Sequence, residues 1–192
     1  MTRTISMMLC VLLAQLAPAA ADLPAGWIKA GSHPAEYDVG VDIATRRGGG
    51  KASGFIRARS GELHGFGTLM QTAGPGEYRG RRVRLSGYVK SETVQSGWAG
   101  MWLRIDGKNQ EMLGFDNMRS RPIKGTTDWT RYEIVLDVPD EAAALAFGVL
   151  LAGDGQVWLD DLRFEVVPST VPTTGMGPPE PPGPPQNLDF EK

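Results

Sequence analysis

The stretch WAGMWLRID, residues 98–106, alternates without a break between two kinds of side chain. Met101, Leu103 and Ile105 occupy one set of positions, and all three are apolar. The other set holds aromatic, charged and small residues: Trp98, Gly100, Trp102, Arg104 and Asp106. Because successive side chains of a β-strand point to opposite faces, this pattern predicts a strand with one face in a core and the other outside it.

Similar segments recur along most of the chain, with turn residues between them. Strands are predicted at residues 37–43, 53–60, 65–73, 81–92, 98–106, 111–118, 129–139, 144–153 and 156–167. Gly87 indicates a bulge or a close backbone approach within its strand. Many short strands separated by turns are typical of an all-β, two-sheet antiparallel jelly-roll sandwich.

One segment is ambiguous between strand and helix. Residues 144–153 are almost wholly apolar, which fits a buried strand or a short helix. Gly148 inside the segment and the turn after it favour the strand. Residues 140–146 carry the clearest helical signal, and we expect at most one turn there.

The ends of the chain differ in composition from this sandwich, which we place at residues 22–167. Residues 1–21 have a basic start, a short apolar run and small residues at their end, as a secretory signal peptide does. An uncleaved N-terminal anchor is the alternative. Residues 168–186 are rich in proline and predict an extended tether, and residues 187–192, NLDFEK, form a strand-like tail. We therefore expect export to the periplasm or the exterior, with no membrane span after cleavage.

Composition excludes several kinds of chemistry. Cys10 is the single cysteine and lies in the expected signal peptide, so the mature chain would have no disulfide, thiolate zinc site or cysteine nucleophile. The formal net charge is −2, from 20 basic and 22 acidic residues, and this balance does not indicate a nucleic-acid partner.

Catalytic motifs are missing from the sequence. The two histidines, His33 and His64, lie in expected loops and in no recognisable catalytic motif. Asp160 and Asp161 could be an acid pair, but neighbouring strand residues point to opposite faces. We therefore expect a protein that is not an enzyme, and a small stand-alone hydrolase is the least favoured class.

Four segments, in order, resemble the galactose-binding-like jelly-roll family, which includes many secreted carbohydrate-binding modules. They are LPAGW at 23–27, GGGKASGFIRARS at 48–60, GTTDWTRYEIVLDVP at 125–139 and GQVWLDDLRFEVV at 155–167. The resemblance covers residues 23–167. It implies that Trp27, Trp129 and Trp158 belong to the framework of the fold.

The resemblance also implies a structural metal and a use for the tail. In the family, the closing strand often contributes an aspartate to a structural Ca²⁺, with a glutamate from the first strand; here the candidates are Asp160, Asp161 and Glu191. A surface acid pair is the alternative. NLDFEK resembles that first strand, so it either docks in cis or on a neighbouring module, or is the stump of a truncated second module.

The outward face of residues 98–106 is the candidate ligand site. Sugars bind to exposed aromatic faces flanked by planar polar groups, which Trp98, Trp102, Arg104 and Asp106 can supply. Asn109, Asp116 and Asn117 follow and are predicted to contribute, with Gln110 and Arg119 as further donors. The alternative is one tryptophan packed under a loop and an otherwise solvated sheet face. Two hypotheses result: a non-catalytic module that binds a glycan or another polyol-rich ligand, and a structural module that acts through its C-terminal strand.

Overall fold

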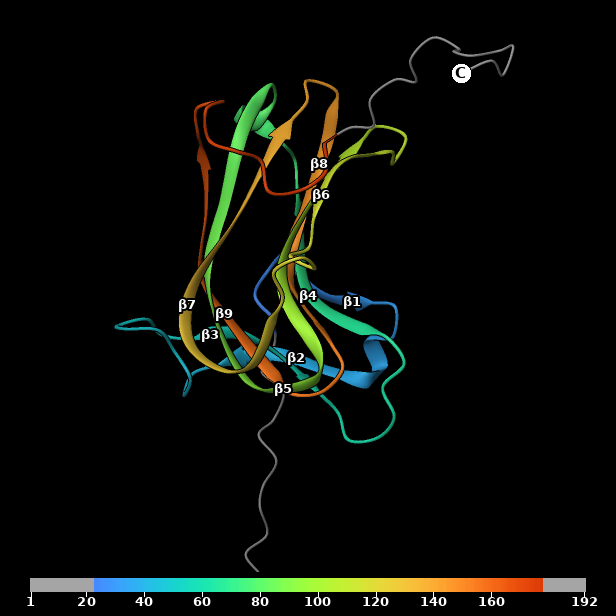
Figure 1. The fold of residues 1–192 in the computed structure, drawn as a ribbon, viewed down its shortest axis with the longest axis vertical. Helices are drawn as coiled ribbons and strands as arrows, with labels where there is room; N and C mark the ends of the chain where they lie inside the picture. The colour runs from blue at the N-terminus through green and yellow to red at the C-terminus, as the bar shows by residue number, and fades with distance from the viewer. Residues whose placement is uncertain (1–22, 178–192) are drawn as a thin grey trace, which may run out of the picture.

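The computed structural model describes residues 23–177, and these form antiparallel strands with two short 3-10 helices (Figure 1). No α-helix occurs within this range, so the predicted all-β class is confirmed. The strands are β1 (Trp27–Gly31), β2 (Tyr37–Asp42), β3 (Ser53–Ala58), β4 (Phe66–Ala73), β5 (Arg81–Gly107), β6 (Met112–Asp116), β7 (Ile123–Val138), β8 (Ala142–Ala152) and β9 (Gln156–Val166). The 3-10 helices are η1 (Pro34–Glu36) and η2 (Gly76–Tyr78).

Strand β5 belongs to both layers of the sandwich (Figure 1). Its first half, through Glu92, lies between β7 and β9, in a layer ordered β2-β3-β9-β5-β7. Its second half, from Trp98, lies between β8 and β6, in a layer ordered β1-β4-β8-β5-β6. The two strands predicted at 81–92 and 98–106 are thus one bent strand. Register shifts against β7 and a positive φ at Thr93 mark the bend between its halves.

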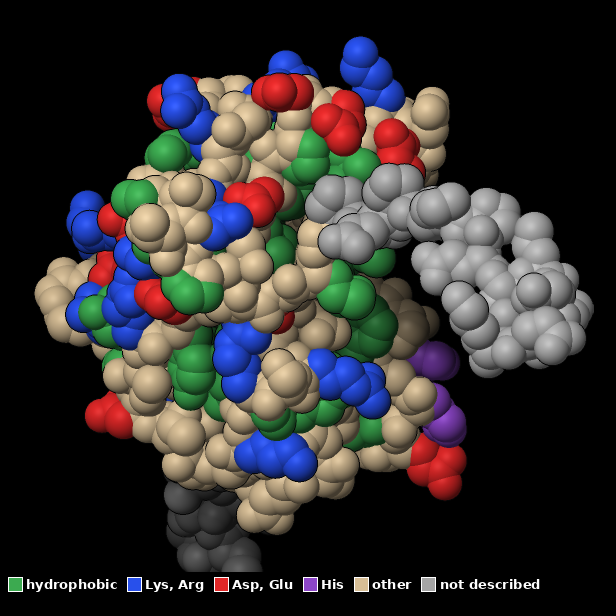
Figure 2. Space-filling view, turned by 45° about the horizontal axis from the view of Figure 1, so that its top comes forward, with side chains coloured by type: hydrophobic (Ala, Val, Ile, Leu, Met, Phe, Trp, Pro, Cys, Tyr) green, Lys and Arg blue, Asp and Glu red, His purple; other side chains and the backbone are tan. Residues whose placement is uncertain are grey.

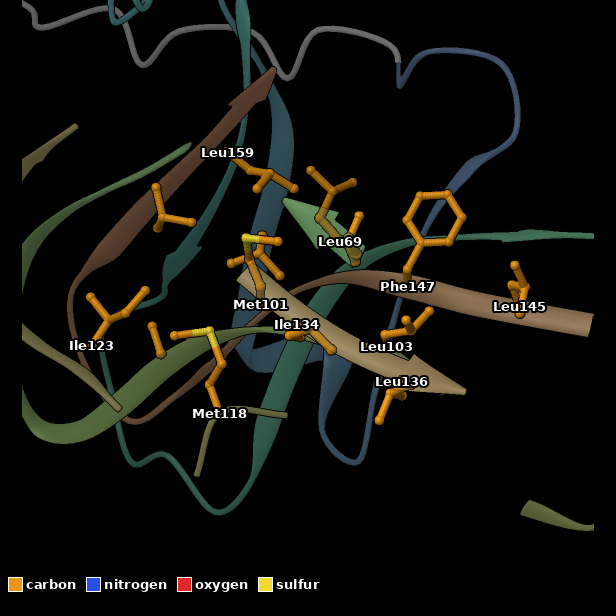
Figure 3. Packing of buried hydrophobic residues seen from close by; sticks show 14 of the residues in the cluster. Leu69, Met101, Leu103, Met118, Ile123, Ile134, Leu136, Leu145, Phe147 and Leu159 are labelled. Atoms are coloured by element: carbon orange, nitrogen blue, oxygen red, sulfur yellow. The ribbon is translucent and has the colours of Figure 1, made fainter. Parts of the chain in front are cut away.

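The core lies between the two layers and is built from the apolar positions of the alternating strands (Figure 3). Met101 and Leu103 of β5 are fully buried there, together with Ile134 and Leu136 of β7. Leu69 of β4 and Leu159 of β9 are also buried, at 3% and 4% exposure. The face that the alternation of residues 98–106 assigned to the core is therefore confirmed.

The bulge expected at Gly87 is present. The pairing of β5 with β9 shifts between Ser86 and Tyr88, and Asp161 on β9 has a φ of 52°. A Cβ at Gly87 would lie 2.7 Å from Cδ2 of Leu162. The glycine thus lets the bulged strand approach closely.

One hydrogen-bonded turn precedes β8, and the rest of the segment at 140–146 is strand. The backbone N–H of Ala142 donates to the carbonyl of Pro139, 3.1 Å, and from Ala142 on the backbone pairs with β5 and β4. Pairing with two neighbouring strands overrides the weak helical propensity of this segment. The strand predicted at 144–153 is correct. Strand β1 was not predicted at all; it pairs with β4 at the edge of its layer.

The segment after β9 stays on the sandwich longer than expected. The backbone N–H of Thr174 donates to the carbonyl of Val135, 2.9 Å, and Met176 exchanges two backbone hydrogen bonds with Phe115, of 2.9 and 3.0 Å. Strand edges present unpaired backbone groups, and residues 174–176 satisfy some of those on β6 and β7. A tether that starts at residue 168 is therefore not what the structure shows.

The expected signal peptide, its cleavage site and the tail at 187–192 lie outside the described residues. Between residues 23 and 177, no helix is long and apolar enough to cross a membrane.

Candidate functional site

A groove of about 790 Å³ lies over the outer face of the layer that contains β4, β8, the second half of β5, and β6. Its floor and walls include Thr68, Trp98, Trp102, Arg104, Phe115 and Leu150. The protein's two histidines lie together at one edge of the molecule in Figure 2, and His64 lines the groove.

The alternation of β5 positions the principal groove residues. Ala99, Met101 and Leu103 are fully buried in the core, whereas Trp98, Trp102 and Arg104 project from the opposite face of the same strand. A separate apolar cluster forms there around Trp102, Ala146 and Leu150, with Met70, Trp98 and Phe115 packed against it. The sequence therefore placed these three side chains on the correct face.

Trp102 is the floor of the groove, and the expectation of an exposed stacking face is wrong for this residue. Its side chain packs into the smaller cluster, and the residue is 8% exposed. Its indole Nε1 donates to Oγ1 of Thr68, 2.8 Å. The prediction failed because the covering side chains come from β4 and β8, far away in the sequence.

Of the two tryptophans that line the groove, Trp98 is the one that stays partly exposed. It is half-buried, and the guanidinium of Arg119 lies 6.0 Å from the centre of its ring. Gly100, two residues along β5, lets the segment after β6 approach, since a Cβ there would lie 2.7 Å from the carbonyl oxygen of Asn117. The close approach brings Asn117 and Arg119 to the groove beside Trp98.

Arg104 and Asp106 form a pair on the same strand. Nε and Nη2 of Arg104 lie 3.0 and 2.9 Å from Oδ2 of Asp106. Asp106 is 9% exposed, and its other oxygen, Oδ1, has no hydrogen-bond partner among the described residues. Asp106 does not line the groove itself. It holds the exposed Arg104 side chain that does.

Of the three predicted site residues after Asp106, which are Asn109, Asp116 and Asn117, the structure places one in the groove and two outside it. Asn117 lines the groove, and its Oδ1 accepts the backbone N–H of Arg119, 3.1 Å. Asn109 lies in the exposed turn between β5 and β6, where its backbone N–H donates to Glu111, and it does not reach the groove.

Asp116 requires a correction. It is 6% exposed, and its carboxylate accepts hydrogen bonds from Nη2 of Arg121, 2.7 Å, and from the hydroxyl of Thr174, 2.6 Å. Side chains alternate along β6, so Asp116 and the groove residue Phe115 point to opposite faces. Asp116 therefore anchors the segment at 174–176, and the groove does not include it.

The side of the groove formed by β4 was not predicted from the sequence. Thr68 and Met70 line the groove, whereas Leu69 between them lies in the core. The alternation in GFGTLMQTA carried this signal, but nothing in it identified a groove.

His64 lies at the rim of the groove. Its backbone N–H and ring Nδ1 lie 2.9 and 3.0 Å from the two carboxylate oxygens of Glu36. Burial opposes ionisation of Glu36, but these hydrogen bonds outweigh it and lower its pKa.

The predicted calcium ligands do not assemble into a cation site within the described residues. The guanidinium of Arg47 forms an ion pair with the carboxylate of Asp161, and Asp160 accepts the backbone N–H of Asp161, 2.8 Å. No group of three His, Cys, Asp or Glu side chains suited to a metal occurs between residues 23 and 177. Glu191 lies outside the described residues, so calcium binding stays a prediction that depends on it.

Comparison by sequence finds one relative of known name. No family model matches the chain. The chain is 44% identical over 172 residues to YbfP of Bacillus subtilis (strain 168), named as an uncharacterized HTH-type transcriptional regulator. The alignment covers 87% of this chain and 57% of the regulator, so the chain spans little more than half the length of this relative.

Comparison by structure finds carbohydrate-binding modules. The CBM22-1 xylan-binding domain of Paenibacillus barcinonensis Xyn10C matches with a TM-score of 0.56 at 17% identity, over 79% of this chain and 98% of that domain. A xylan-binding CBM 22 domain, formerly called x6b, matches with a TM-score of 0.51 at 13% identity, over 74% and 87%. The enzymatically active domain of bacteriophage CBA120 tailspike protein 4 matches with a TM-score of 0.56 at 13% identity, over 74% of this chain and 20% of that one.

The chain has the jelly-roll β-sandwich fold of these modules. The resemblance to galactose-binding-like jelly rolls, first indicated by four short motifs, is thereby confirmed at the level of the fold.

Proposed function

We propose that the protein is a non-catalytic module that binds saccharides in the groove over β4, β8, β5 and β6. The observation that carries the proposal is the half-buried ring of Trp98 beside Asn117 and Arg119. Trp98 packs against the buried cluster that contains Trp102 and Leu150. A pyranose presents C–H groups that stack on an aromatic face, and its hydroxyls pair with planar amide and guanidinium groups. The xylan-binding neighbours with the same fold add support.

The make-up of the groove favours binding over hydrolysis. Glycoside hydrolysis normally uses two carboxylates on either side of the scissile bond. Within the described part of the chain, the residues that line the groove include no aspartate and no glutamate. Asp106, the nearest acid on β5, is paired with Arg104 and does not line the groove.

The proposal is tested by titrating the full chain with a panel of soluble polysaccharides in a calorimeter, followed by variants. Trp98→Ala should weaken binding at least severalfold because it removes the stacking surface. Trp129→Ala is the matched control, since Trp129 is also half-buried but lies on β7, outside the groove. Circular dichroism should show both variants folded. Unchanged affinity in Trp98→Ala, or equal losses in both variants, would reject the groove as the site.

A second role for the same groove is favoured by the likeness to a transcriptional regulator. We propose as the alternative that the module senses a soluble saccharide on behalf of another domain. A sensor site should bind a short oligosaccharide as tightly as the polymer, whereas a module that attaches to a polysaccharide gains from its length. Comparing the affinities for a trimer, a hexamer and the polymer separates the two roles.

A further inference from the structure

We infer that the groove takes an acidic saccharide, with a uronic-acid carboxylate bound by Arg119 next to a sugar ring stacked on Trp98; this inference rests on the proposed function. The described side chains lining the groove include Arg104, Arg119 and His64 but no acid. A guanidinium is planar and matches a carboxylate with two parallel hydrogen bonds.

Arg119 is the arginine whose charge is available. It is exposed and forms no ion pair with any residue between 23 and 177. Its neighbour Arg121 contrasts with it, because Nη1 and Nη2 of Arg121 lie 3.2 and 2.7 Å from the carboxylate of Asp116. The contact of Arg119 with the Trp98 ring, at 6.0 Å, lies at the outer limit of a cation–π interaction, so the guanidinium is not committed to the ring.

The backbone holds Arg119 in place at the groove. Met118, directly before it, is fully buried in the core and has a φ of 63°. The Arg119 N–H is bonded to Oδ1 of Asn117, 3.1 Å. A buried anchor and a closed turn reduce the freedom that the arginine would lose on binding, which favours affinity.

The other charges around the groove locate the anion site at Arg119. The charge of Arg104 is offset by Asp106, although Nη1 of Arg104 keeps no hydrogen-bond partner within the described residues. Nδ1 and Nε2 of His64 lie 3.0 and 3.6 Å from carboxylate oxygens of Glu36 and Glu62, so that rim is not basic. Arg104 also lies six residues along β5 from Trp98, about 20 Å at 3.3 Å per residue. Arg104 therefore serves a different unit of the saccharide, through hydrogen bonds.

The experiment compares soluble polygalacturonate with its fully methyl-esterified form, neutral arabinoxylan and dextran sulfate, each titrated into the full chain at low and high salt. Binding to polygalacturonate should be at least tenfold tighter than to the esterified form and should weaken with salt. Arg119→Gln should lose at least tenfold in affinity for polygalacturonate, and Arg119→Lys should recover part of it. Arg163→Gln is the control of equal charge, since Arg163 is also exposed and forms no ion pair in the described chain; its affinity should equal that of the wild type.

The outcomes separate this inference from the proposed function. If the neutral polysaccharide binds as tightly as the acid, and Trp98→Ala but not Arg119→Gln weakens it, the acidic ligand is overturned while saccharide binding stands. If dextran sulfate binds as tightly as polygalacturonate, or if Arg119→Gln and Arg163→Gln lose affinity equally, the carboxylate site at Arg119 is overturned. If none of the four polymers binds, both the inference and the proposed function fail for these ligands.

Discussion

The indole Nε1 of Trp102 donates a 2.8 Å hydrogen bond to the hydroxyl of Thr68, and that hydroxyl donates onward to the carbonyl of Val149, also 2.8 Å. The two bonds join β5, β4 and β8 beneath the groove. All three groups are buried, so their polar atoms depend on one another for partners. These hydrogen bonds therefore hold the groove floor in a fixed position within the protein itself.

Trp102→Ala should destabilise the protein strongly, because it removes a buried aromatic side chain and opens a cavity. We expect a loss of about 3–5 kcal/mol in the free energy of unfolding, measured by urea denaturation. Thr68→Val should cost about 1–3 kcal/mol, since it leaves the indole N–H without an acceptor. Thr68→Ser retains the hydroxyl and should cost clearly less than Thr68→Val. A Trp102→Ala protein as stable as the wild type would show that this side chain is not part of the floor.

Gly148→Ala should disturb the pairing of β8 with β4. A Cβ at Gly148 would lie 2.1 Å from the carbonyl oxygen of Leu69, and backbone atoms in a paired strand cannot easily move away. Overpacking of this kind costs about 1–3 kcal/mol or more, which thermal unfolding would detect. Gly49→Ala is the control, because nothing lies within 4 Å of its added methyl group. Equal melting temperatures for the two variants would contradict the close approach of the strands.

The ion pair between Arg82 and Asp137 should make part of the stability depend on pH. Nε and Nη2 of Arg82 each lie 2.7 Å from a carboxylate oxygen of Asp137, while Nη1 bonds the carbonyls of Ser169 and Val171. The hydrogen bonds from Arg82 lower the pKa of Asp137 below its usual range, despite partial burial. A lowered folded-state pKa contributes stability above the unfolded-state pKa, and this contribution is lost as pH falls through the folded-state value.

The test is the unfolding free energy of Asp137→Asn between pH 7 and the lowest pH at which the wild type folds. The variant should be less stable at neutral pH, and the difference should shrink below the unfolded pKa of aspartate, about 3.9. Because Asp137 is half-exposed, the difference should be small and reduced by salt. A difference that is constant with pH would argue against the pair.

The tail NLDFEK keeps its two expected roles as predictions. A cavity of about 190 Å³ is lined by Trp27, Leu69, Leu159 and Leu162, and also by Asp160 and Asp161. Its volume and its apolar lining fit one side chain such as Phe190. If the tail docks there, deleting residues 187–192 should lower the melting temperature, and added Ca²⁺ should stabilise the full chain more than the truncated one. Phe190→Ala should lower the melting temperature as much as the deletion does when no Ca²⁺ is added. Identical melting curves with and without the tail, in the presence or absence of Ca²⁺, would leave it as an unused stump.

Export is a further prediction from the first 21 residues. The intact mass of the protein recovered from the periplasm or the medium of an expressing bacterium should correspond to a chain that starts at Asp22. A chain that retained Met1 and stayed with the cells would support an uncleaved anchor or a cytoplasmic role, as in a transcriptional regulator.

Local sequence determined which face is apolar in the alternating strands, and therefore the two-layer class of the fold. Met101, Leu103 and Ile105 could be assigned to the core from nine residues, because the side-chain period of a strand is two regardless of its neighbours. The same reasoning placed Trp98, Trp102 and Arg104 together on the other face.

Only the tertiary structure decided what covers each of those residues. Trp102 is buried because Thr68 and Leu150 approach from β4 and β8, and Asp116 is structural because Thr174 reaches it from beyond the last strand. Nothing in the residues next to Trp102 or Asp116 distinguishes them from Trp98 and Asn117. Burial and hydrogen bonding between strands depend on which distant segments become neighbours, and a period-two pattern carries no information about that choice.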